Sequence, residues 1–148
     1  MKTTDFSIAI TVDQSAKEVF DAINNPGAWW SGKIEGNSSK LNDEFIYSYK
    51  TFHMSRQRVI EMIPSKKVVW LVVDSQINYV EYKNEWTGTK MIFEITEQES
   101  KTQLRFTHQG LIPEVACFDS CSNSWSRLIR EALFTLISTG KSREIVLA

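Results

Sequence analysis

Residues 105–125 read RFTHQGLIPEVACFDSCSNSW, a pattern that predicts a β-strand, a turn and the start of a helix. We expect His108 to lie on the buried face of the strand. Gly110 and Pro113 would turn the chain, and Trp125 would anchor the helix over the sheet. The stretch therefore predicts a joint between a sheet and a C-terminal helix, with a catalytic or metal site at the same place as the alternative.

The helix after this joint carries a long apolar stripe at helical spacing, formed by Trp125, Leu128, Ile129, Ala132, Leu133, Leu136 and Ile137. Gly140 stands where a helix commonly ends, and Lys141 and Arg143 follow it. A helix from Glu114 to Thr139 would span ~39 Å, enough to cross a whole sheet. Poor helix formers at 119–123 favour either a break in the helix or a late start near 120.

Alternating or continuous apolar runs predict strands at 5–12, 44–50, 56–63, 66–74, 89–97 and 101–108, with a less regular stretch at 75–86 that has room for a short strand. The run at 66–74 is nearly all β-branched, which indicates a central strand. The last two strands suit a hairpin whose inward side chains are Met91, Phe93, Ile95, Leu104, Phe106 and His108. The polar, glycine-containing segment 31–43 is expected to be a loop.

Near the N-terminus, Ser15 and Glu18 form a capping box in front of an amphipathic helix. Asn25-Pro26-Gly27 ends that helix, and AWWSG is expected to form a short second helix or turn. The element order predicts an α+β fold over residues 1–148 as a single domain. It would be a curved antiparallel sheet of about six strands, two short N-terminal helices and a long C-terminal helix packed across the sheet. One helix stripe cannot fill a strongly bent sheet, so we expect a pocket between the layers.

The composition excludes some classes of partner. A formal charge of −1 over 148 residues, without long charged blocks, gives no electrostatic reason to expect nucleic acid or an anionic membrane. The first residues lack the apolar core of a signal peptide, and no run approaches the length of a membrane span. We therefore expect a cytoplasmic protein without integral membrane association, in which the two cysteines are reduced thiols.

Several segments carry a resemblance to a known family: SAKEVFDAI and NPGAWW, VIEMIPSKKVVWLV, NEWTGTKMIFEI, LRFTHQGLIP, CSNSW and LISTGKSRE. Together they resemble the helix-grip fold of the START/SRPBCC (birch-pollen-allergen-like) superfamily, in the branch named for the activator of the ninety-kilodalton heat-shock ATPase. The resemblance implies a binder or carrier of small apolar molecules. The eukaryotic namesake docks on its chaperone through a separate domain for which we expect no room here, so a chaperone partner is not expected.

Large rings at the expected interface between sheet and helix are the main candidates for ligand contacts. Tyrosine and tryptophan combine an apolar body with a polar tip, as an amphipathic ligand requires. The candidate ligand-binding residues are Trp30, Tyr47, Tyr49, Trp70, Phe93, Phe106, His108, Trp125, Ile129 and Leu133. The alternative is that these side chains simply fill the core.

His108 is the one weak candidate for a catalytic residue, since a histidine facing a cavity can orient a ligand or transfer a proton. Its alternative is a histidine at the edge of the core with satisfied hydrogen bonds. Cys117 and Cys121 would share a helix face and, with His108 and Glu114 or Asp119, could hold zinc. We expect two packed thiols instead, and no metal or cofactor.

These observations predict a non-catalytic module that binds a small hydrophobic or amphipathic molecule between the sheet and the C-terminal helix. Two alternatives stay open. One, which the superfamily resemblance implies, is an enzyme of cyclase or hydratase type that uses the same cavity, with His108 and a tyrosine hydroxyl as its acid–base pair. The other is a chaperone-associated stress-response protein, by analogy with the family's namesake.

Overall fold

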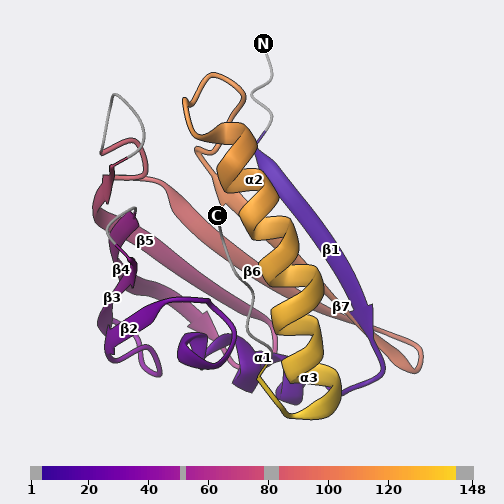
Figure 1. The fold of residues 1–148 in the computed structure, drawn as a ribbon. Helices are drawn as coiled ribbons and strands as arrows, with labels where there is room; N and C mark the ends of the chain where they lie inside the picture. The colour runs from indigo at the N-terminus through magenta and orange to yellow at the C-terminus, as the bar shows by residue number, and fades with distance from the viewer. Residues whose placement is uncertain (1–4, 51–52, 79–83, 143–148) are drawn as a thin grey trace.

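A computed structural model of the chain describes residues 5–50, 53–78 and 84–142 (Figure 1). The strands are β1 Phe6–Val12, β2 Lys33–Gly36, β3 Glu44–Tyr49, β4 His53–Ile63, β5 Lys67–Ile77, β6 Lys90–Gln98 and β7 Lys101–Gln109. The helices are α1 Ala16–Ile23, the 3₁₀ turn η1 Pro26–Ala28, α2 Phe118–Arg127, the π-helix η2 Leu128–Leu133 and α3 Phe134–Thr139. Their order confirms the predicted α+β architecture.

The strands form one antiparallel sheet in the order β1-β7-β6-β5-β4-β3-β2. The described residues thus form seven strands instead of about six. The additional strand, β2, lies in the segment that we predicted to be a loop. It pairs with β3 at the edge of the sheet and leaves most of its side chains exposed. Backbone pairing without a buried face requires no apolar alternation, and this strand therefore leaves no pattern in the sequence.

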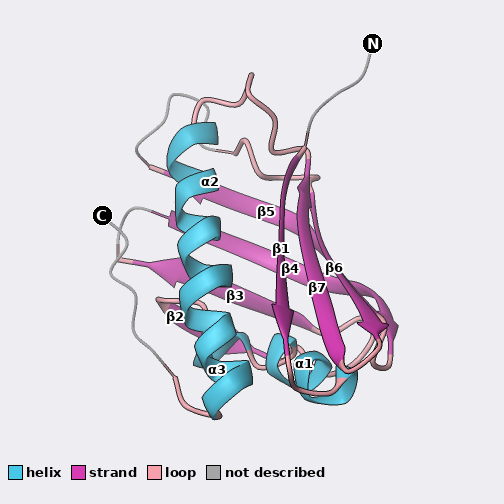
Figure 2. Ribbon diagram, turned by 90° about the vertical axis from the view of Figure 1, so that its right-hand side faces the viewer, coloured by secondary structure: helices cyan, strands magenta, loops and turns pink. Residues whose placement is uncertain are grey.

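The C-terminal helix crosses one face of the sheet as a continuous rod made of α2, η2 and α3 (Figures 1 and 2). It begins at Phe118, close to the predicted late start, and ends at Thr139. Gly140 follows with a φ of 76°, the left-handed conformation that was expected of it. Lys141 is described, whereas Arg143 lies outside the described residues.

The central part of this rod is the π-helix η2, which the sequence did not predict. A π turn is wider than an α turn because its hydrogen bonds run from residue i to i+5. Leu128, Ile129, Ala132 and Leu133 are all buried against the sheet. The same apolar spacing fits an α-helix, so the pattern could not distinguish the two. None of the helices in the described part of the chain combines the length and the apolar character needed to cross a bilayer.

The N-terminal elements close one end of the layer between sheet and helix. Ser15 Oγ accepts a hydrogen bond from the Glu18 backbone N at 3.2 Å, which confirms the predicted cap of α1. Val19 and Ile23 are buried, and α1 packs against β6 and α3. The predicted short second element is η1, which begins at Pro26, slightly earlier than the AWWSG segment.

The predicted joint between β7 and the C-terminal helix is present. Gly110 has a φ of 103°, and a Cβ there would lie 2.6 Å from Thr89 Cγ2. Its backbone N donates to Asp5 Oδ1 at 2.9 Å. Only glycine fits this turn, because the chain must both adopt a left-handed conformation and approach Thr89 closely. The joint therefore brings the end of β7 against the residues that precede β6.

Candidate functional site

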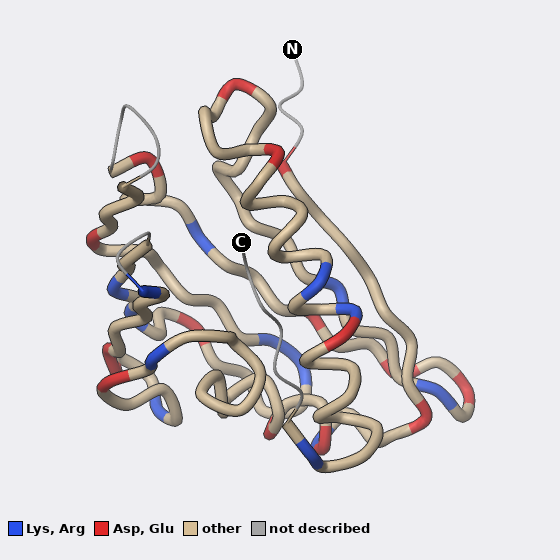
Figure 3. The backbone as a smooth tube through the Cα atoms, viewed as in Figure 1, with Lys and Arg blue, Asp and Glu red and all other residues tan. Residues whose placement is uncertain are grey.

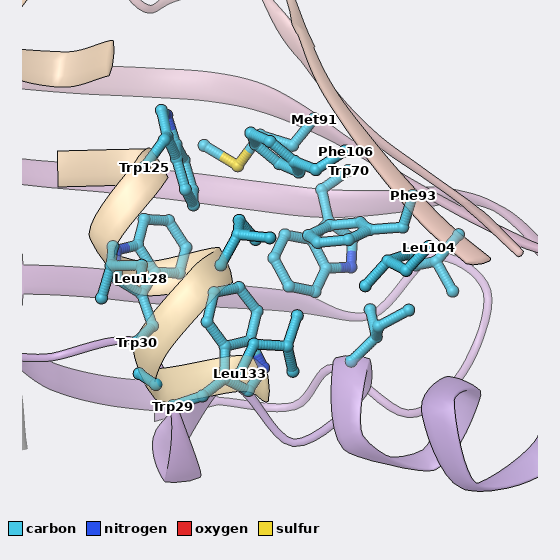
Figure 4. Packing of buried hydrophobic residues seen from close by; sticks show 14 of the residues in the cluster. Trp29, Trp30, Trp70, Met91, Phe93, Leu104, Phe106, Trp125, Leu128 and Leu133 are labelled. Carbon is cyan, nitrogen blue, oxygen red and sulfur yellow. The ribbon is translucent and has the colours of Figure 1, made fainter. Parts of the chain in front are cut away.

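An aromatic layer fills the space between the sheet and the C-terminal helix (Figure 4). Trp30 stacks on Tyr47 with ring centroids 4.0 Å apart and lies 5.1 Å from the ring of Trp125. Phe106 lies 4.4 Å from Trp125 and 5.0 Å from Phe93. These rings come from β3, β6, β7, α2 and the segment after η1, so the fold gathers them from distant parts of the chain.

The structure brings together nine of the ten predicted ligand residues in this layer. Trp30, Tyr47, Trp70, Phe93, Phe106, His108, Trp125, Ile129 and Leu133 are each at most 3% exposed. Tyr49 is only partly buried, and Lys50 Nζ lies 5.4 Å from its ring centroid. Directly under η2 the aromatic side chains therefore act as core. Beside the layer, a hollow of about 200 Å³ is lined by residues 27–32 and Ser142.

His108 lies in the middle of a series of hydrogen bonds that runs from Trp125 to the Trp86 carbonyl. Trp125 Nε1 donates to His108 Nδ1 at 3.0 Å, and His108 Nε2 lies 2.8 Å from Thr89 Oγ1. Because Nδ1 accepts, the neutral ring carries its proton on Nε2 and donates it to Thr89 Oγ1. Thr89 Oγ1 in turn donates to the Trp86 carbonyl at 2.6 Å. Both ring nitrogens are therefore occupied by protein groups.

This environment keeps His108 neutral. Its side chain is fully buried, and burial together with the charge of His53 lowers its pKa from 6.5 to about 3. An acid–base residue needs a free nitrogen within hydrogen-bond reach of its substrate. The geometry therefore fits the alternative of a satisfied core histidine at the joint, and it offers no proton transfer by His108.

Cys117 and Cys121 form a disulfide, so the prediction of two reduced thiols is wrong. Their four-residue spacing at the start of α2 places the Cα atoms 5.5 Å apart, within the usual range for a disulfide. Two sulfur atoms bonded to each other supply no thiolate for zinc. Trp86 Nε1 donates to Cys117 Sγ at 3.3 Å, which ties the first turn of α2 to the segment before β6.

The inner face of the sheet also carries a polar row that sequence analysis missed. We define the polar row as His53, Ser55 and Gln57 of β4 with Ser75 of β5. Ser55 and Gln57 are fully buried and Ser75 is 5% exposed. Period-two alternation places them on the same face as the buried Val59. The predicted strand began at residue 56, so the inward positions of His53 and Ser55 ahead of it were not recognised, and Gln57 within it was not singled out.

The polar row is only partly satisfied by hydrogen bonds. Gln57 Nε2 donates to Ser55 Oγ, and Ser75 Oγ is 3.0 Å from Thr87 Oγ1. Gln57 Oε1 and His53 Nε2 are buried and have no hydrogen-bond partner among the described residues. Burial lowers the pKa of His53 from 6.5 to about 4, which leaves it neutral near pH 7.

Aromatic rings border the polar row on the side of the helix. The His53 ring is 4.3 Å from that of Trp86 and 5.4 Å from that of Tyr47. Tyr47 pairs with Ser55 across β3 and β4, and its hydroxyl donates to the Ser31 carbonyl. The site thus combines a polar floor with an aromatic wall.

Fold and site together define a class of protein: an α+β domain of helix-grip type, with a buried aromatic and polar layer between a curved sheet and a C-terminal helix. The family described as "Activator of Hsp90 ATPase homolog 1-like protein" matches residues 13–137, and the chain belongs to this family. It is the branch that the sequence motifs indicated. A comparison with curated proteins found no significant match.

Solved structures share the fold at low sequence identity. The Aha1 dimer from Colwellia psychrerythraea is similar with a TM-score of 0.75 and 21% identity, covering 94% of this chain and 99% of that one. A protein of Staphylococcus saprophyticus gives 0.70 and 14%, covering 98% of this chain and 100% of that chain. A protein of Mesorhizobium loti gives 0.69 and 14%, covering 88% and 96%. These similarities establish the fold alone.

Proposed function

We propose that this protein binds a small hydrophobic or amphipathic molecule between the sheet and the C-terminal helix, without catalysing a reaction. The observation that carries the proposal is the polar row, buried on the inner face of the sheet beside Tyr47 and Trp86. Buried polar groups cost free energy unless they are hydrogen-bonded, and a purely structural core has no need of them there. A ligand with an apolar body and a polar end would match the aromatic wall and the polar floor.

The contacts on each side of this site have different roles in the proposal. Trp30, Tyr47 and Trp86 would supply apolar contact area, at ~25 cal/mol for each Å² of ligand surface buried. The polar row would fix the orientation of the ligand. Trp70, Phe93, Phe106, Trp125, Ile129 and Leu133 would form the packed wall behind it, and His108 would hold Trp125 and Thr89 in place.

The test is a ligand screen by thermal shift and tryptophan fluorescence with lipids, sterols and aromatic polyketides. A ligand present at about a hundred times its Kd should stabilise the folded protein by ~2.7 kcal/mol. The inner-face variant Ser55→Leu should abolish the response by occupying the polar row. Its matched control, Ser48→Leu on the neighbouring β3, lies at an outward position and should retain it. No response of the wild type to any class would contradict the proposal.

The family description favours one other function, the activation of the Hsp90 ATPase. Mixing the protein with a bacterial Hsp90 and measuring ATP hydrolysis would separate the two. We expect no change in the hydrolysis rate, and a stimulation would support the chaperone function instead.

A cytoplasmic location is part of the proposal.

A further inference from the structure

The disulfide between Cys117 and Cys121 joins a firmly held residue to the first turn of a helix. Cys117 precedes α2 and is held from outside the helix, since its backbone N donates to Glu85 Oε1 and its Sγ accepts from Trp86 Nε1, each at 3.3 Å. Cys121 lies in the first turn of α2, and its backbone N donates to the Cys117 carbonyl at 2.7 Å. The S–S bond reinforces this turn covalently.

The start of α2 has little else to stabilise it. Of the ten described residues of α2, two are buried, Cys121 and Trp125. Five others are poor helix formers: Ser120, Ser122, Asn123, Ser124 and Ser126. Each is about twofold less favourable in a helix than alanine, which amounts to about thirtyfold for the five together. A disulfide that closes so short a loop stabilises by about the same factor. Loss of the bond therefore shifts the first turn toward an open state.

The first turn of α2 lies at one end of the layer between sheet and helix, and α1 lies at the other end (Figure 2). Cys117 contacts Trp86, which is 4% exposed. The Trp86 ring lies 4.3 Å from the ring of His53 and 6.0 Å from that of Trp125. Opening of the turn thus uncovers Trp86 and the end of the polar row.

The surroundings of the bond favour a switch over a catalytic dithiol. Catalytic thiols are exposed and have a lowered pKa, often beside a cation. Cys117 and Cys121 are 1% and 4% exposed, and the chain carries acidic residues but no Lys or Arg between positions 106 and 126 (Figure 3). The Glu85 carboxylate already occupies the start of the helix. Disulfides in reducing compartments are mostly transient, and those that are not catalytic sense the redox state.

We propose that the Cys117–Cys121 disulfide is a redox switch that a dithiol reductant opens. A thiolate of the reductant bonds to Cys121 Sγ, the S–S bond breaks, and Cys117 leaves as a thiolate that takes up a proton. The second thiol of the reductant then displaces Cys121, which takes up the other proton. Two electrons and two protons pass from the dithiol to the cysteines. Reduction releases the first turn of α2 and opens the layer beside Trp86.

The role of this opening rests on the proposed function, because it regulates the access of a small molecule to the site. The opening itself is a property of the protein alone and can be measured without a ligand. The chain contains two cysteines, so a reductant has this one bond to act on.

The first test is amide hydrogen exchange on the full chain, before and after reduction with dithiothreitol. Amides at positions 121–125 should exchange about thirtyfold faster in the reduced protein, and reoxidation should restore the slow rates. Amides at positions 104–108 of β7 serve as the internal reference and should exchange at unchanged rates.

Two variants locate the effect. Cys121→Ala lacks the bond, so dithiothreitol should leave its exchange rates unchanged. Asn123→Ala replaces an exposed poor helix former and should slow exchange of the reduced protein about twofold. The comparison of oxidised and reduced wild type requires neither variant and stands if one does not fold.

The second test measures the association rate of decan-1-ol by tryptophan fluorescence. If entry requires the open turn, the rate follows the open fraction and should rise about thirtyfold on reduction. Equal association rates in both forms, unchanged amide exchange on reduction, or a bond that dithiothreitol breaks only in the unfolded protein would each overturn the inference. If no compound of the broad screen binds either form, the proposed function fails, and amide exchange alone still decides whether the switch exists.

Discussion

Thr89 is the residue that connects His108 to the backbone. Its hydroxyl accepts a hydrogen bond from His108 Nε2 and donates one to the Trp86 carbonyl. The Thr89 side chain thereby completes the series of hydrogen bonds that starts at Trp125 Nε1. Gly110 lies directly against Thr89, so close that a Cβ at this position would not fit. The joint that the sequence predicted around His108 thus depends on a threonine that lies directly before β6.

Replacing Thr89 with valine keeps the shape of the side chain and removes the hydroxyl. His108 Nε2–H then has no acceptor in a fully buried position, and we expect the free energy of unfolding to fall by about 1–3 kcal/mol. The measurement is urea denaturation, with a lower midpoint at an unchanged slope. As a control, Thr107→Val lies on the outward side of β7 and should change stability by less than ~0.5 kcal/mol. Equal midpoints for wild type and Thr89→Val would show that the hydrogen-bond chain contributes nothing.

At the scale of elements, the first turn of α2 is held by three contacts. The disulfide joins Cys117 to Cys121, and Trp86 Nε1 donates to Cys117 Sγ. The Glu85 carboxylate accepts from the backbone N of Ala116 at 2.8 Å and of Cys117 at 3.3 Å. The hydrogen bonds of Trp86 and Glu85 attach the residues at the start of α2 to the segment before β6, whereas the disulfide closes the first turn of the helix on itself.

Removing the disulfide should loosen the first turn of α2. A bridge that closes so short a loop is worth about 2 kcal/mol on the chain-entropy estimate, and we expect Cys121→Ala to lower the free energy of unfolding by that amount. Cys117→Ala should cost more, since Trp86 Nε1 also loses its acceptor. Urea denaturation compares the variants, and a thiol-reactive dye should label the wild type only after reduction. Labelling without reductant would contradict the disulfide.

At the scale of the whole molecule, the interface between the layers contains two histidines, and burial keeps both side chains uncharged near pH 7. Burial lowers the pKa of His53 to about 4 and that of His108 to about 3. In the unfolded chain both return to a pKa near 6.5, so between pH 6.5 and about 4 the unfolded state binds more protons than the folded state. Stability is therefore complete above pH 6.5 and is lost as the pH falls.

The expected loss is about 2 kcal/mol for each histidine at pH 5. Urea denaturation at pH 7.5 and at pH 5.0 measures it, since few carboxylates have yet been protonated at the lower pH. His53→Gln should remove about half of the difference between the two conditions whatever its own effect on stability. The same stability at both pH values would contradict the assignment of two buried, neutral histidines.

Local sequence patterns predicted most of the architecture of this protein. The apolar stripe of the C-terminal helix, the hairpin that holds Phe93 and Phe106, and the cap at Ser15 were all predicted, because periodicity and capping are properties of short segments. The edge strand β2 and the π-helix η2 were not. The first has no buried face, and the second shares its apolar spacing with an α-helix.

The sequence by itself determined that the rings of Tyr47, Phe93 and Phe106 face the interface, since alternation along a strand fixes the side from which a residue projects. Tertiary structure alone decided what those residues do. His108 is a structural residue without a free ring nitrogen, because Trp125 and Thr89, distant in sequence, form hydrogen bonds with its two nitrogens. Gln57 and His53 kept unpartnered atoms because no described neighbour reaches them. Hydrogen-bond partners come from distant parts of the chain, and no local pattern specifies them.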